Sequence, residues 1–429
     1  MAKKINEVLK EALLEAKPSG EEIKDVESKV KIFTEKLGRE FKNLKIDTEI
    51  FVGGSFAKRT LIKKEKYDVD IFVRFDRKYA KQNISDLTRR ALKKIKMKED
   101  VKVIHGSRDY FKIYVEPWLC FEIVPTIKVS KPKEAENITD LSYYHVRYIN
   151  KKIKEKLVND IILAKSFCHA NRVYGAESHI KGFSGYSLEL LVYYYKGFLG
   201  FLRGIAKSKD EKIIIDIEKD YSSKKQVLMD MNSSKLESPI ILVDPTFKQR
   251  NALATLSSEV FGKFREKCRE FLKRPGIEFF RLKEIDFMKM ENSARKKGYD
   301  SMLIRISTEK QEGAVAGSKL LKFYNHLASA IGKYFDAKEK VFYYKDEKDA
   351  DCFFAVKKKD RIILKGPPEK LAEETKKFKS RHKKTFAKSG HIYAEEKINF
   401  SLKEFLHQWK NKNSRIIKEM YISEIKILQ

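Results

Sequence analysis

The chain opens with two stretches in which apolar residues recur every three or four positions, the spacing of an amphipathic helix. They predict helices over residues 4–16 and 21–38, separated by the helix-breaking residues Pro18-Ser19-Gly20. Short runs rich in β-branched and aromatic residues follow, with turn residues between them, and these runs predict strands. The strands are expected over residues 50–52, 67–71, 101–105, 111–115 and 119–124, with a helix from 83 to about Met97 among them.

From residue 140 to residue 275 the apolar spacing is mainly helical. Helices are expected over residues 154–174, 186–202 and 253–272, with a short buried strand at 240–245 and with Arg250-Asn251 entering the third helix. The glycine-rich connection 174–186 is typical of a functional loop. Lys273-Arg274-Pro275-Gly276 marks a domain boundary.

Beyond this boundary strands and helices are mixed, which is typical of an α+β module. Strands are expected over residues 301–306, 340–344, 352–356 and 361–364, and helices over 317–335 and 369–378. The order of elements therefore predicts an α+β protein of three domains, over residues 1–140, 141–276 and 277–429.

The net charge of the chain predicts the kind of partner that it binds. The 429 residues include 92 Lys and Arg against 61 Asp and Glu, a net charge of +31. An excess of this size, spread along a folded chain with 42% hydrophobic residues, indicates a polyanionic partner such as nucleic acid. A surface adapted to heat or salt would explain part of the charge but not the whole surplus.

Cysteine usage and hydropathy indicate a protein of a reducing compartment. The four cysteines are far apart, with no CxxC or CxxH spacing, so neither a disulfide framework nor a zinc site is expected. The N-terminus is charged and lacks the apolar segment of a signal peptide. The most apolar run, residues 186–202, contains Glu189 and Lys196, so no membrane span is expected. We expect a cytoplasmic protein that does not bind membranes.

The stretch FVGGSFAKRTLIKKEKYDVDIFVRF (residues 51–75) carries the strongest chemical signal. Asp68 and Asp70 are two apart in a predicted strand, so they point to one face while their neighbours point into the core. Two carboxylates so close favour a cation between them, and Mg²⁺ is held by such ligands together with substrate phosphates. The Gly53-Gly54-Ser55 turn offers N–H groups to an anion. The combination predicts a nucleotidyl transfer site.

A third acid, Glu122, lies between Phe121 and Ile123 in a later predicted strand. Burying a lone carboxylate is costly. Glu122 therefore either joins Asp68 and Asp70 in a set of three carboxylates or faces water on a surface strand. The spacing alone leaves both readings open.

The segment from residue 376 to residue 388 contains seven Lys and Arg and no acid, interleaved with Phe378, His382 and Phe386. Such a run is either a solvated helix face or an RNA contact. The overall charge of the chain favours RNA. The residues expected to contact RNA are Lys376, Lys377, Lys379, Arg381, Lys383 and Lys384.

Gly54-Ser55, the Asp68-x-Asp70 strand and a later third acid together resemble the pattern of the DNA polymerase β-like nucleotidyltransferases. Two segments, VYGAESHIKGFSGYSLELLV (173–192) and ILVDPTFKQRNALA (241–254), look closely like the archaeal-type (class I) CCA-adding enzymes, which are tRNA nucleotidyltransferases. The segment ILKGPPEKL (363–371) is similar as well. The resemblance implies a polymerase β-like head, a helical central domain and an α+β C-terminal domain that binds tRNA.

The resemblance also implies roles for single residues. Asp68, Asp70 and Glu122 would be the catalytic carboxylates and the ligands of Mg²⁺. Arg250, with Asp244, would read the incoming base. The other implied nucleotide contacts are Gly54, Ser55, Lys58 and Arg59 for the triphosphate, Ser142 and His145 beside the nucleotide, and Lys165 and Tyr174 for triphosphate and sugar.

The chain departs from the family pattern in three places. The family usually has Glu where this chain has Asp68, and Asp where it has Glu122. Its GSYAR motif reads Gly-Ser-Phe-Ala-Lys here, with the arginine shifted to Arg59. All three changes keep the charge, so the chemistry is expected to survive them.

The implied reaction is attack of a tRNA 3′-hydroxyl on the α-phosphate of CTP or ATP, adding C, C and A without a nucleic-acid template and releasing pyrophosphate. One alternative is a poly(A) polymerase or another RNA 3′-terminal nucleotidyltransferase, which would share the three acids. The other is an inactive RNA-binding protein of the same fold, against which the intact acids argue. The sequence does not fix the oligomeric state, and a homodimer is one option.

Overall fold

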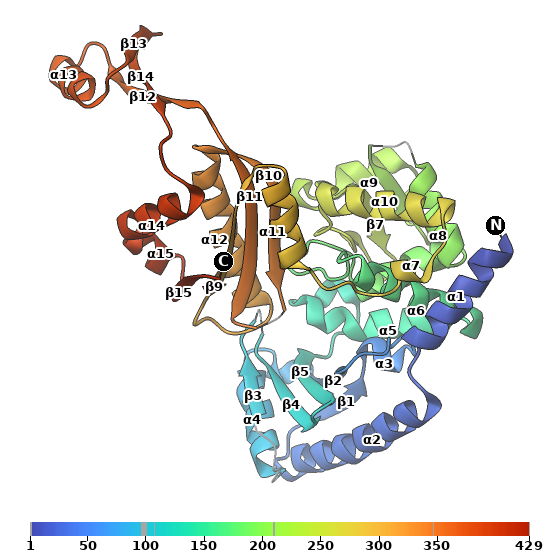
Figure 1. The fold of residues 1–429 in the computed structure, drawn as a ribbon. Coiled ribbons are helices and arrows are strands. Elements are labelled where there is room, and N and C mark those ends of the chain that lie inside the picture. The colour runs from blue at the N-terminus through green and yellow to red at the C-terminus, as the bar shows by residue number, and fades with distance from the viewer. Residues whose placement is uncertain (1, 96–100, 107, 209–210, 346, 429) are drawn as a thin grey trace. The chain divides into compact units, whose positions relative to one another are not determined.

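A computed structural model describes the chain except for residues 1, 96–100, 107, 209–210, 346 and 429. The described residues form two compact units, Met1–Lys283 and Glu284–Gln429, called here the first and second unit (Figure 1). Helices and strands are mixed in both units, which confirms the predicted α+β class. The division into three domains stays a prediction.

The N-terminal part of the first unit is built on a five-stranded sheet with the order β1-β2-β5-β4-β3 (Figure 1). Its strands are β1 (Thr48–Val52), β2 (Tyr67–Phe75), β3 (Val101–Ile104), β4 (Tyr110–Glu116) and β5 (Leu119–Ile127). β2 and β5 lie side by side in parallel, and the other neighbours are antiparallel. All five predicted strands are therefore confirmed.

Helices α2 (Gly20–Asn43) and α4 (Ile84–Lys94) supply apolar side chains to the core of this sheet. Phe33 of α2, for example, lies 5.0 Å from Phe121 of β5, ring centre to ring centre. Ser19 and Glu22 form a capping box at the start of α2, which satisfies backbone N–H groups there. α2 runs on past the predicted end at residue 38 because Phe41 also packs into the core. The predicted end of α4 near Met97 lies outside the described residues.

The rest of the first unit is mainly helical. Its helices are α1 (Ala2–Ala16), α5 (Ser142–Lys152), α6 (Glu155–Ala170), α7 (Gly185–Tyr194), α8 (Phe198–Lys207), α9 (Lys224–Asp230) and α10 (Ser258–Lys273). A small sheet of β6 (Ile213–Asp216), β7 (Ile240–Asp244) and β8 (Phe247–Asn251) lies among them. The core is rich in phenylalanine, and Phe167, Phe198, Phe264 and Phe271 are all fully buried.

Two predictions for this region are wrong. The single helix expected over residues 186–202 is two helices, α7 and α8, because Lys196 (φ 59°) and Gly197 (φ 125°) adopt left-handed backbone conformations. Arg250-Asn251 does not enter a helix. These residues lie on β8, which turns back along β7 just after Pro245, and α10 begins only at Ser258.

The second unit has a four-stranded sheet with the order β10-β11-β9-β15. Its strands are β9 (Asp300–Ser307), β10 (Phe335–Tyr344), β11 (Asp349–Lys358) and β15 (Glu424–Ile427), and its helices are α11 (Phe287–Lys296), α12 (Ala314–Gly332), α14 (Leu402–Lys412) and α15 (Ser414–Glu419). β12 (Arg361–Pro368), β14 (His391–Lys397) and β13 (Thr385–Lys388) form a separate small sheet with α13 (Ala372–Arg381). The basic segment thus spans a helix and a strand, where only a helix to residue 378 was predicted.

No helix in the described part of the chain combines the length and apolar character needed to span a bilayer. The four cysteines are buried and free.

Candidate functional site

The predicted acids lie on the two central strands of the five-stranded sheet. On β2, Asp68 is exposed and Asp70 half-buried, whereas Val69 and Ile71 are fully buried. The alternation predicted for this strand is therefore confirmed. Asp70 lies directly opposite Glu122 of β5 in the parallel register. This placement favours the reading in which Glu122 stands beside the two aspartates.

The electrostatics of these acids suit a bound cation. Burial, together with the charges of Glu122 and Asp68, raises the pKa of Asp70 to about 7. Lys112 of β4 partly relieves the repulsion, because its Nζ lies 2.7 Å from the Glu122 Oε1. No three His, Cys, Asp or Glu side chains within the described ranges already stand close enough together to hold a metal ion. The donor set of carboxylate oxygens nonetheless matches the chemistry that Mg²⁺ prefers.

The glycine turn packs directly on Asp70. Gly54 begins the short helix α3 (Gly54–Ala57) with a left-handed φ of 60°. A Cβ at this position would lie 1.7 Å from the Asp70 Oδ2, so only glycine leaves room for the carboxylate. The backbone N–H of Gly53 donates to the Asp70 carbonyl at 2.8 Å and fixes the turn against β2. Ser55 follows in α3, so the predicted phosphate turn and the acids are neighbours.

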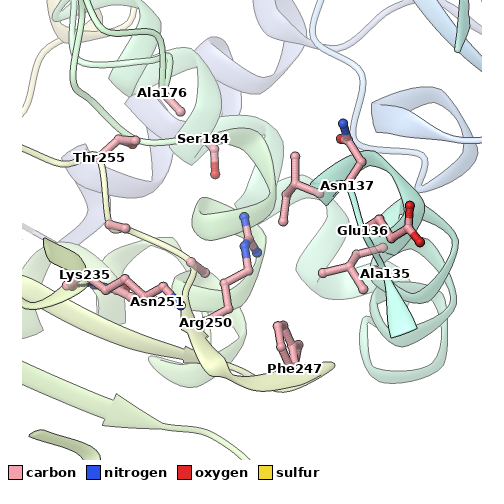
Figure 2. Close-up of a pocket in the computed structure, with 14 residues that line it drawn as sticks. Ala135, Glu136, Asn137, Ala176, Ser184, Lys235, Phe247, Arg250, Asn251 and Thr255 are labelled. Carbon is pink, nitrogen blue, oxygen red and sulfur yellow. Dashed lines mark hydrogen bonds between the residues drawn. The ribbon is translucent and has the colours of Figure 1, made fainter. Parts of the chain in front are cut away.

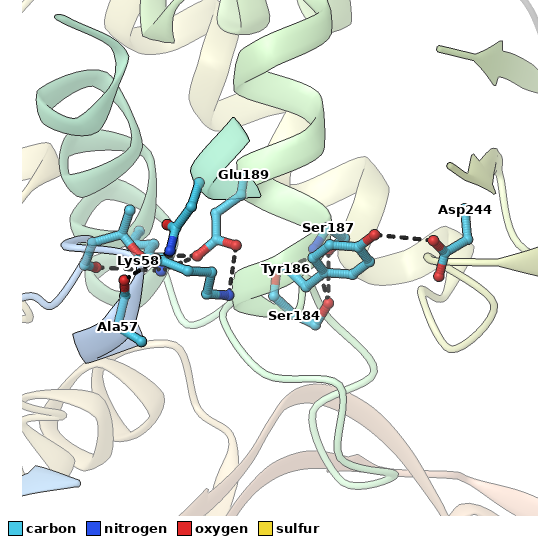
Figure 3. A network of polar contacts seen from close by, with 10 residues as sticks. Ala57, Lys58, Ser184, Tyr186, Ser187, Glu189 and Asp244 are labelled. Atoms are coloured by element: carbon cyan, nitrogen blue, oxygen red, sulfur yellow. Dashed lines mark hydrogen bonds and ion pairs between the residues drawn. The ribbon is translucent and has the colours of Figure 1, made fainter. Parts of the chain in front are cut away.

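A buried polar cluster lies beside this turn (Figure 3). Glu189 of α7 is fully buried, and its carboxylate accepts from the Nζ of Lys58 at 2.6 Å and from the Nζ of Lys165 at 2.8 Å. The Thr60 hydroxyl donates to the same carboxylate at 2.9 Å and accepts from Lys165 at 2.7 Å. The structure separates the predicted pair Lys58-Arg59, because Lys58 points into this cluster while Arg59 is exposed. We call Lys58, Thr60, Lys165 and Glu189 the lysine cluster.

The pKa values in the lysine cluster reflect its excess of positive charge. Burial raises the pKa of Glu189, but the charges of Lys165 and Lys58 outweigh it and bring the value down to about 2. Burial and the charge of Lys58 lower the pKa of Lys165 to about 8, although Glu189 opposes the shift. Tyr174 lies close by: a Cβ on Gly185 would be 3.0 Å from the Tyr174 hydroxyl and 3.6 Å from the Lys165 Nζ. Burial raises the pKa of Tyr174, so it stays a neutral phenol.

A second cluster is centred on Asp244, which is fully buried at the end of β7. Its carboxylate accepts from the Arg250 guanidinium at 2.5 Å, from the Tyr186 hydroxyl at 2.9 Å and from the Thr246 N–H at 2.9 Å. The Nε2 of His145 lies 3.2 Å from Asp244 and donates to it, since a carboxylate can only accept. We call Asp244, His145, Tyr186 and Arg250 the arginine cluster.

Aromatic stacking and charge hold the arginine cluster together. The rings of His145 and Tyr186 stack with centres 4.0 Å apart. Burial lowers the pKa of His145, so its ring is neutral near pH 7. Burial raises the pKa of Asp244, but the hydrogen bond from His145 and the charge of Arg250 outweigh it and leave the value well below the usual range. Asp244 thus stays ionised and fixes one edge of the guanidinium.

Arg250 points into a pocket of about 370 Å³ (Figure 2). Phe247, Ser184, Asn137 and Thr255 line other parts of the same pocket. A planar guanidinium held on one side by Asp244 keeps its remaining N–H donors in a fixed direction. The pocket therefore offers directional hydrogen bonds beside an aromatic ring.

Helix α5, which carries Ser142 and His145, is anchored to the five-stranded sheet, and His145 therefore reaches the arginine cluster. Asp140 is buried just before α5, and its Oδ1 accepts from the backbone N–H of Ile127 at 2.9 Å and from Arg108 at 2.6 Å. This carboxylate joins the end of β5 to the start of α5. Ser142 is the first residue of that helix.

In the second unit, the six basic residues expected to contact RNA are all exposed. In the same small module the exposed ring of Phe386 on β13 stacks on Tyr393 of β14, with ring centres 5.6 Å apart. Phe378 of α13 packs over Gly366 of β12, where a Cβ would come within 2.7 Å of the ring. The basic residues thus lie on a helix of a small folded module and in the segment between that helix and β13.

The sequence reasoning missed three residues that the structure places at the centre of these clusters. In the sequence Glu189 only interrupts an apolar run, and Lys112 belongs to no motif. Tyr186 lies where the predicted connection 174–186 meets the helix predicted over 186–202, and the structure places it as the second residue of α7, but no role is predicted for it. A charged residue inside a helix that is otherwise apolar, as Glu189 is, was the signal for a buried partner.

Two family models match parts of the first unit. A family model described as tRNA nucleotidyltransferase, second domain, matches residues 159–281. A second model, described as Second Messenger Oligonucleotide or Dinucleotide Synthetase domain, matches residues 3–147. The two matches together cover the clusters described above.

Several archaeal proteins named CCA-adding enzyme are similar in sequence. The protein of Nanoarchaeum equitans is 45% identical over 216 residues, which are 50% of this chain and 53% of that protein. The protein of Methanocaldococcus jannaschii is 28% identical over 420 residues, 92% of this chain and 88% of that protein. The protein of Methanosarcina mazei is 32% identical over 292 residues, 64% of this chain and 58% of that protein. The matched region thus spans little more than half of two of these three relatives.

Solved structures share the fold at low sequence identity. A structure of the Cid1 poly(U) polymerase with Mg and 3′-dATP bound is 16% identical, with a TM-score of 0.51, and covers 66% of this chain and 100% of that chain. A cytoplasmic RNA terminal U-transferase is 15% identical, with a TM-score of 0.50, and covers 66% of this chain and 99% of that chain. At this identity the likeness concerns the fold alone.

Proposed function

We propose that this chain, which belongs to the archaeal-type family of CCA-adding enzymes, adds C, C and A to the 3′ end of tRNA. CTP and ATP would be the nucleotide substrates and pyrophosphate the product. In each step the tRNA 3′-oxygen bonds to the α-phosphorus, and the bond from that phosphorus to the β-phosphate oxygen breaks.

One observation carries this proposal: a single short helix, α7, holds both clusters beside the acids. Tyr186 of α7 contacts Asp244 of the arginine cluster, and Glu189 of α7 contacts both lysines of the lysine cluster. A nucleoside triphosphate needs both a directional surface for its base and cations for its phosphates. The two clusters offer these at a separation fixed by the helix.

The phosphates are proposed to lie at the glycine turn. Gly54 and Ser55 would offer backbone N–H groups, and Lys58 and Lys165 would supply positive charge from the lysine cluster. Arg59 is exposed and would meet the phosphates or the RNA from the solvent side. Tyr174 would place its hydroxyl near the triphosphate and sugar. Most of the rate enhancement would come from positioning and charge rather than from covalent chemistry.

Asp68, Asp70 and Glu122 are proposed to hold Mg²⁺. Burial and the charges of Glu122 and Asp68 raise the pKa of Asp70, and a divalent cation would offset both effects. When bound, Mg²⁺ would lower the pKa of the attacking hydroxyl and neutralise the leaving pyrophosphate. The chain's own contribution is to present the carboxylates on one face of two neighbouring strands.

Base selection is proposed to rest on Arg250. Asp244 holds one edge of its guanidinium, so the free N–H groups point in a fixed direction into the pocket. Ser142 and His145 would line the same nucleotide on the side of α5. Such a site reads the base edge without a template strand.

The tRNA is proposed to lie across all three domains: a catalytic head (1–140), a central domain that binds nucleotide and tRNA (141–276) and a C-terminal body and tail (277–429). Lys376, Lys377, Lys379, Arg381, Lys383 and Lys384 of the tail would bind its backbone phosphates. The free buried cysteines fit a cytoplasmic location.

Single-nucleotide incorporation tests this function. Purified protein with Mg²⁺ receives tRNAs that end at the discriminator base, at C or at CC, each with CTP alone or with ATP alone. We expect CMP on the first two tRNAs and AMP only on the third. Addition of A to the first tRNA would refute CCA addition in favour of a poly(A) polymerase. Absence of CMP from every tRNA would refute it in favour of an inactive RNA-binding protein.

A further inference from the structure

Glu189 joins two parts of the proposed nucleotide site that are far apart in the sequence. Lys58 and Thr60 follow the glycine turn, and Lys165 comes from α6, more than a hundred residues later. All three contact one carboxylate at distances from 2.6 to 2.9 Å. Without this carboxylate the two buried ammonium groups would repel each other at close range.

The lysine cluster is buried and its charges do not balance. Lys165 is 1% exposed, Lys58 is 8% exposed and Glu189 is fully buried, so two ammonium groups share one carboxylate. Lys64 adds a further positive charge toward Lys165, and Tyr174 is neutral. An uncompensated buried charge is costly. The cluster therefore favours an additional anion on the side of Lys58, which faces Asp70 and the glycine turn.

We propose that Glu189 is a positioning residue of the nucleotide site, holding the ammonium groups of Lys58 and Lys165 side by side toward the triphosphate. This inference rests on the proposed function. Glu189 does not touch the nucleotide itself, since both of its oxygens already accept from the lysines and Thr60. It acts by keeping two flexible side chains in one arrangement before the ligand arrives, which lowers the entropic cost of binding.

The place of Glu189 on α7 gives the proposal a specific consequence. The phosphates are common to CTP and ATP, whereas the bases differ. Loss of Glu189 should therefore weaken the binding of CTP and of ATP to the same extent, so the preference for one nucleotide over the other stays unchanged. A residue of the arginine cluster would alter that choice instead.

A purely structural role makes a different prediction. If Glu189 only ties α7 to the turn after α3, its substitution lowers the stability of the protein, and the folded fraction binds nucleotide normally. If it positions the lysines, the folded variant binds poorly at high pH, because the pKa of Lys165 falls further once the neighbouring carboxylate is gone. Lowering the pH then restores the charge of Lys165 and part of the affinity.

The experiment measures the Kd of CTP and of ATP, each with Mg²⁺ and without tRNA, for full-length wild type and Glu189→Gln between pH 6.5 and 9. We expect the variant to bind both nucleotides on the order of tenfold more weakly at pH 8, with a smaller deficit at pH 6.5. The control is Glu49→Gln, which also removes a carboxylate that bridges two cations, Arg74 at 2.9 Å and Lys128 at 3.4 Å. Glu49→Gln should bind like wild type.

Unchanged Kd values for folded Glu189→Gln, or a change confined to one nucleotide, would overturn the proposal. If Glu189→Gln does not fold by circular dichroism, Glu189→Asp takes its place. That variant keeps the charge but reaches one methylene less far, so several-fold weaker binding of both nucleotides is expected, and wild-type affinity would overturn the proposal. CMP addition by wild type is assayed in parallel, so a failure of the proposed function is distinguished from a failure of this inference.

Discussion

Tyr186 and Glu189 are three residues apart on α7, and their side chains enter two different polar clusters. The Tyr186 hydroxyl donates to Asp244, and the Glu189 carboxylate accepts from Lys58 and Lys165 (Figure 3). Residues at this spacing lie on one face of a helix. The Lys58 Nζ also lies 5.9 Å from the centre of the Tyr186 ring, so the two clusters adjoin. One helix face thus sets the distance between the surface proposed for the base and the cations proposed for the phosphates.

Asp70→Ala should lower the rate of nucleotide incorporation by on the order of a thousandfold or more, because the central member of the three carboxylates is lost. Binding of tRNA should be almost unchanged, since Asp70 carries no RNA-binding charge. The measurement is single-turnover CMP addition together with a tRNA binding assay. Asp47→Ala, at an exposed aspartate, is the control. Equal loss of tRNA binding would contradict a metal role for Asp70.

Gly54→Ala should inactivate the enzyme although it adds only a methyl group. Its φ of 60° is strained for alanine, and the new Cβ would lie 1.7 Å from the Asp70 Oδ2. The control is Gly262→Ala in α10, where a Cβ meets nothing within 4 Å and helix propensity should stabilise the fold by up to about 1 kcal/mol. Initial rates of CMP addition and thermal unfolding report the two effects. Normal activity of Gly54→Ala would show that the turn does not shape the site.

Arg250→Gln should reduce discrimination between CTP and ATP more than it reduces catalysis with saturating nucleotide. The reason is that the guanidinium would supply the directional donors in the pocket. The ratio of kcat/KM for the right and the wrong nucleotide should fall by on the order of tenfold or more. Lys248→Gln removes an exposed positive charge from the same strand and serves as the control. An unchanged ratio with weaker tRNA binding would instead place Arg250 on tRNA phosphate.

Nucleotide affinity should fall as the pH rises above about 8, because the pKa of Lys165 is lowered to about 8 and its charge is lost there. The triphosphate itself is already ionised in this range. The free energy of unfolding should change in the opposite direction. Between about pH 8 and 10.5, the ordinary pKa of a lysine, the unfolded chain binds more protons at Lys165 than the folded chain does. The contribution of Lys165 to folding stability therefore increases as the pH rises. Lys165→Met should remove both trends, as measured by CTP Kd and by the free energy of unfolding. A flat affinity profile for wild type would exclude Lys165 as a phosphate ligand.

Replacing Lys376, Lys379 and Lys383 by Gln should weaken tRNA binding and reduce the slope of log Kd against log salt concentration, since fewer counterions are released. The rate of CMP addition with saturating tRNA should stay close to wild type. The matched control replaces Lys289, Lys296 and Lys297, which are equally exposed in the same unit. If both triple variants lose affinity to the same degree, the effect reflects net charge rather than a tail contact.

Local alternation explains why the sequence predicted the acids well. Val69 and Ile71 are buried on either side of Asp70, so the strand and the direction of its carboxylates followed from period two alone. The pairing of Asp70 with Glu122 is a contact between distant segments, and spacing left it open. Gly197 interrupts a helix that its apolar neighbours predicted as continuous, because a left-handed turn leaves little trace in a pattern of apolar positions.

The clusters on α7 could be predicted only in part. Arg250 was singled out, but its place on a strand was not, since β8 has exposed residues at its centre and lacks an apolar pattern. Glu189 was missed because the contacts that make it essential come from Lys58 and Lys165, both far away in the sequence. The strands β13 and β14 after the basic run were also not predicted, and β13 has only four residues, too few for a clear alternation.

The most direct test of CCA addition is the sequence of the product. A tRNA that ends at its discriminator base is incubated with the protein, Mg²⁺ and both CTP and ATP in excess, and its 3′ end is sequenced over time. CCA addition predicts that the 3′ end grows through C and CC and stops at CCA. A tail that continues beyond the first A, or that begins with A, would contradict it.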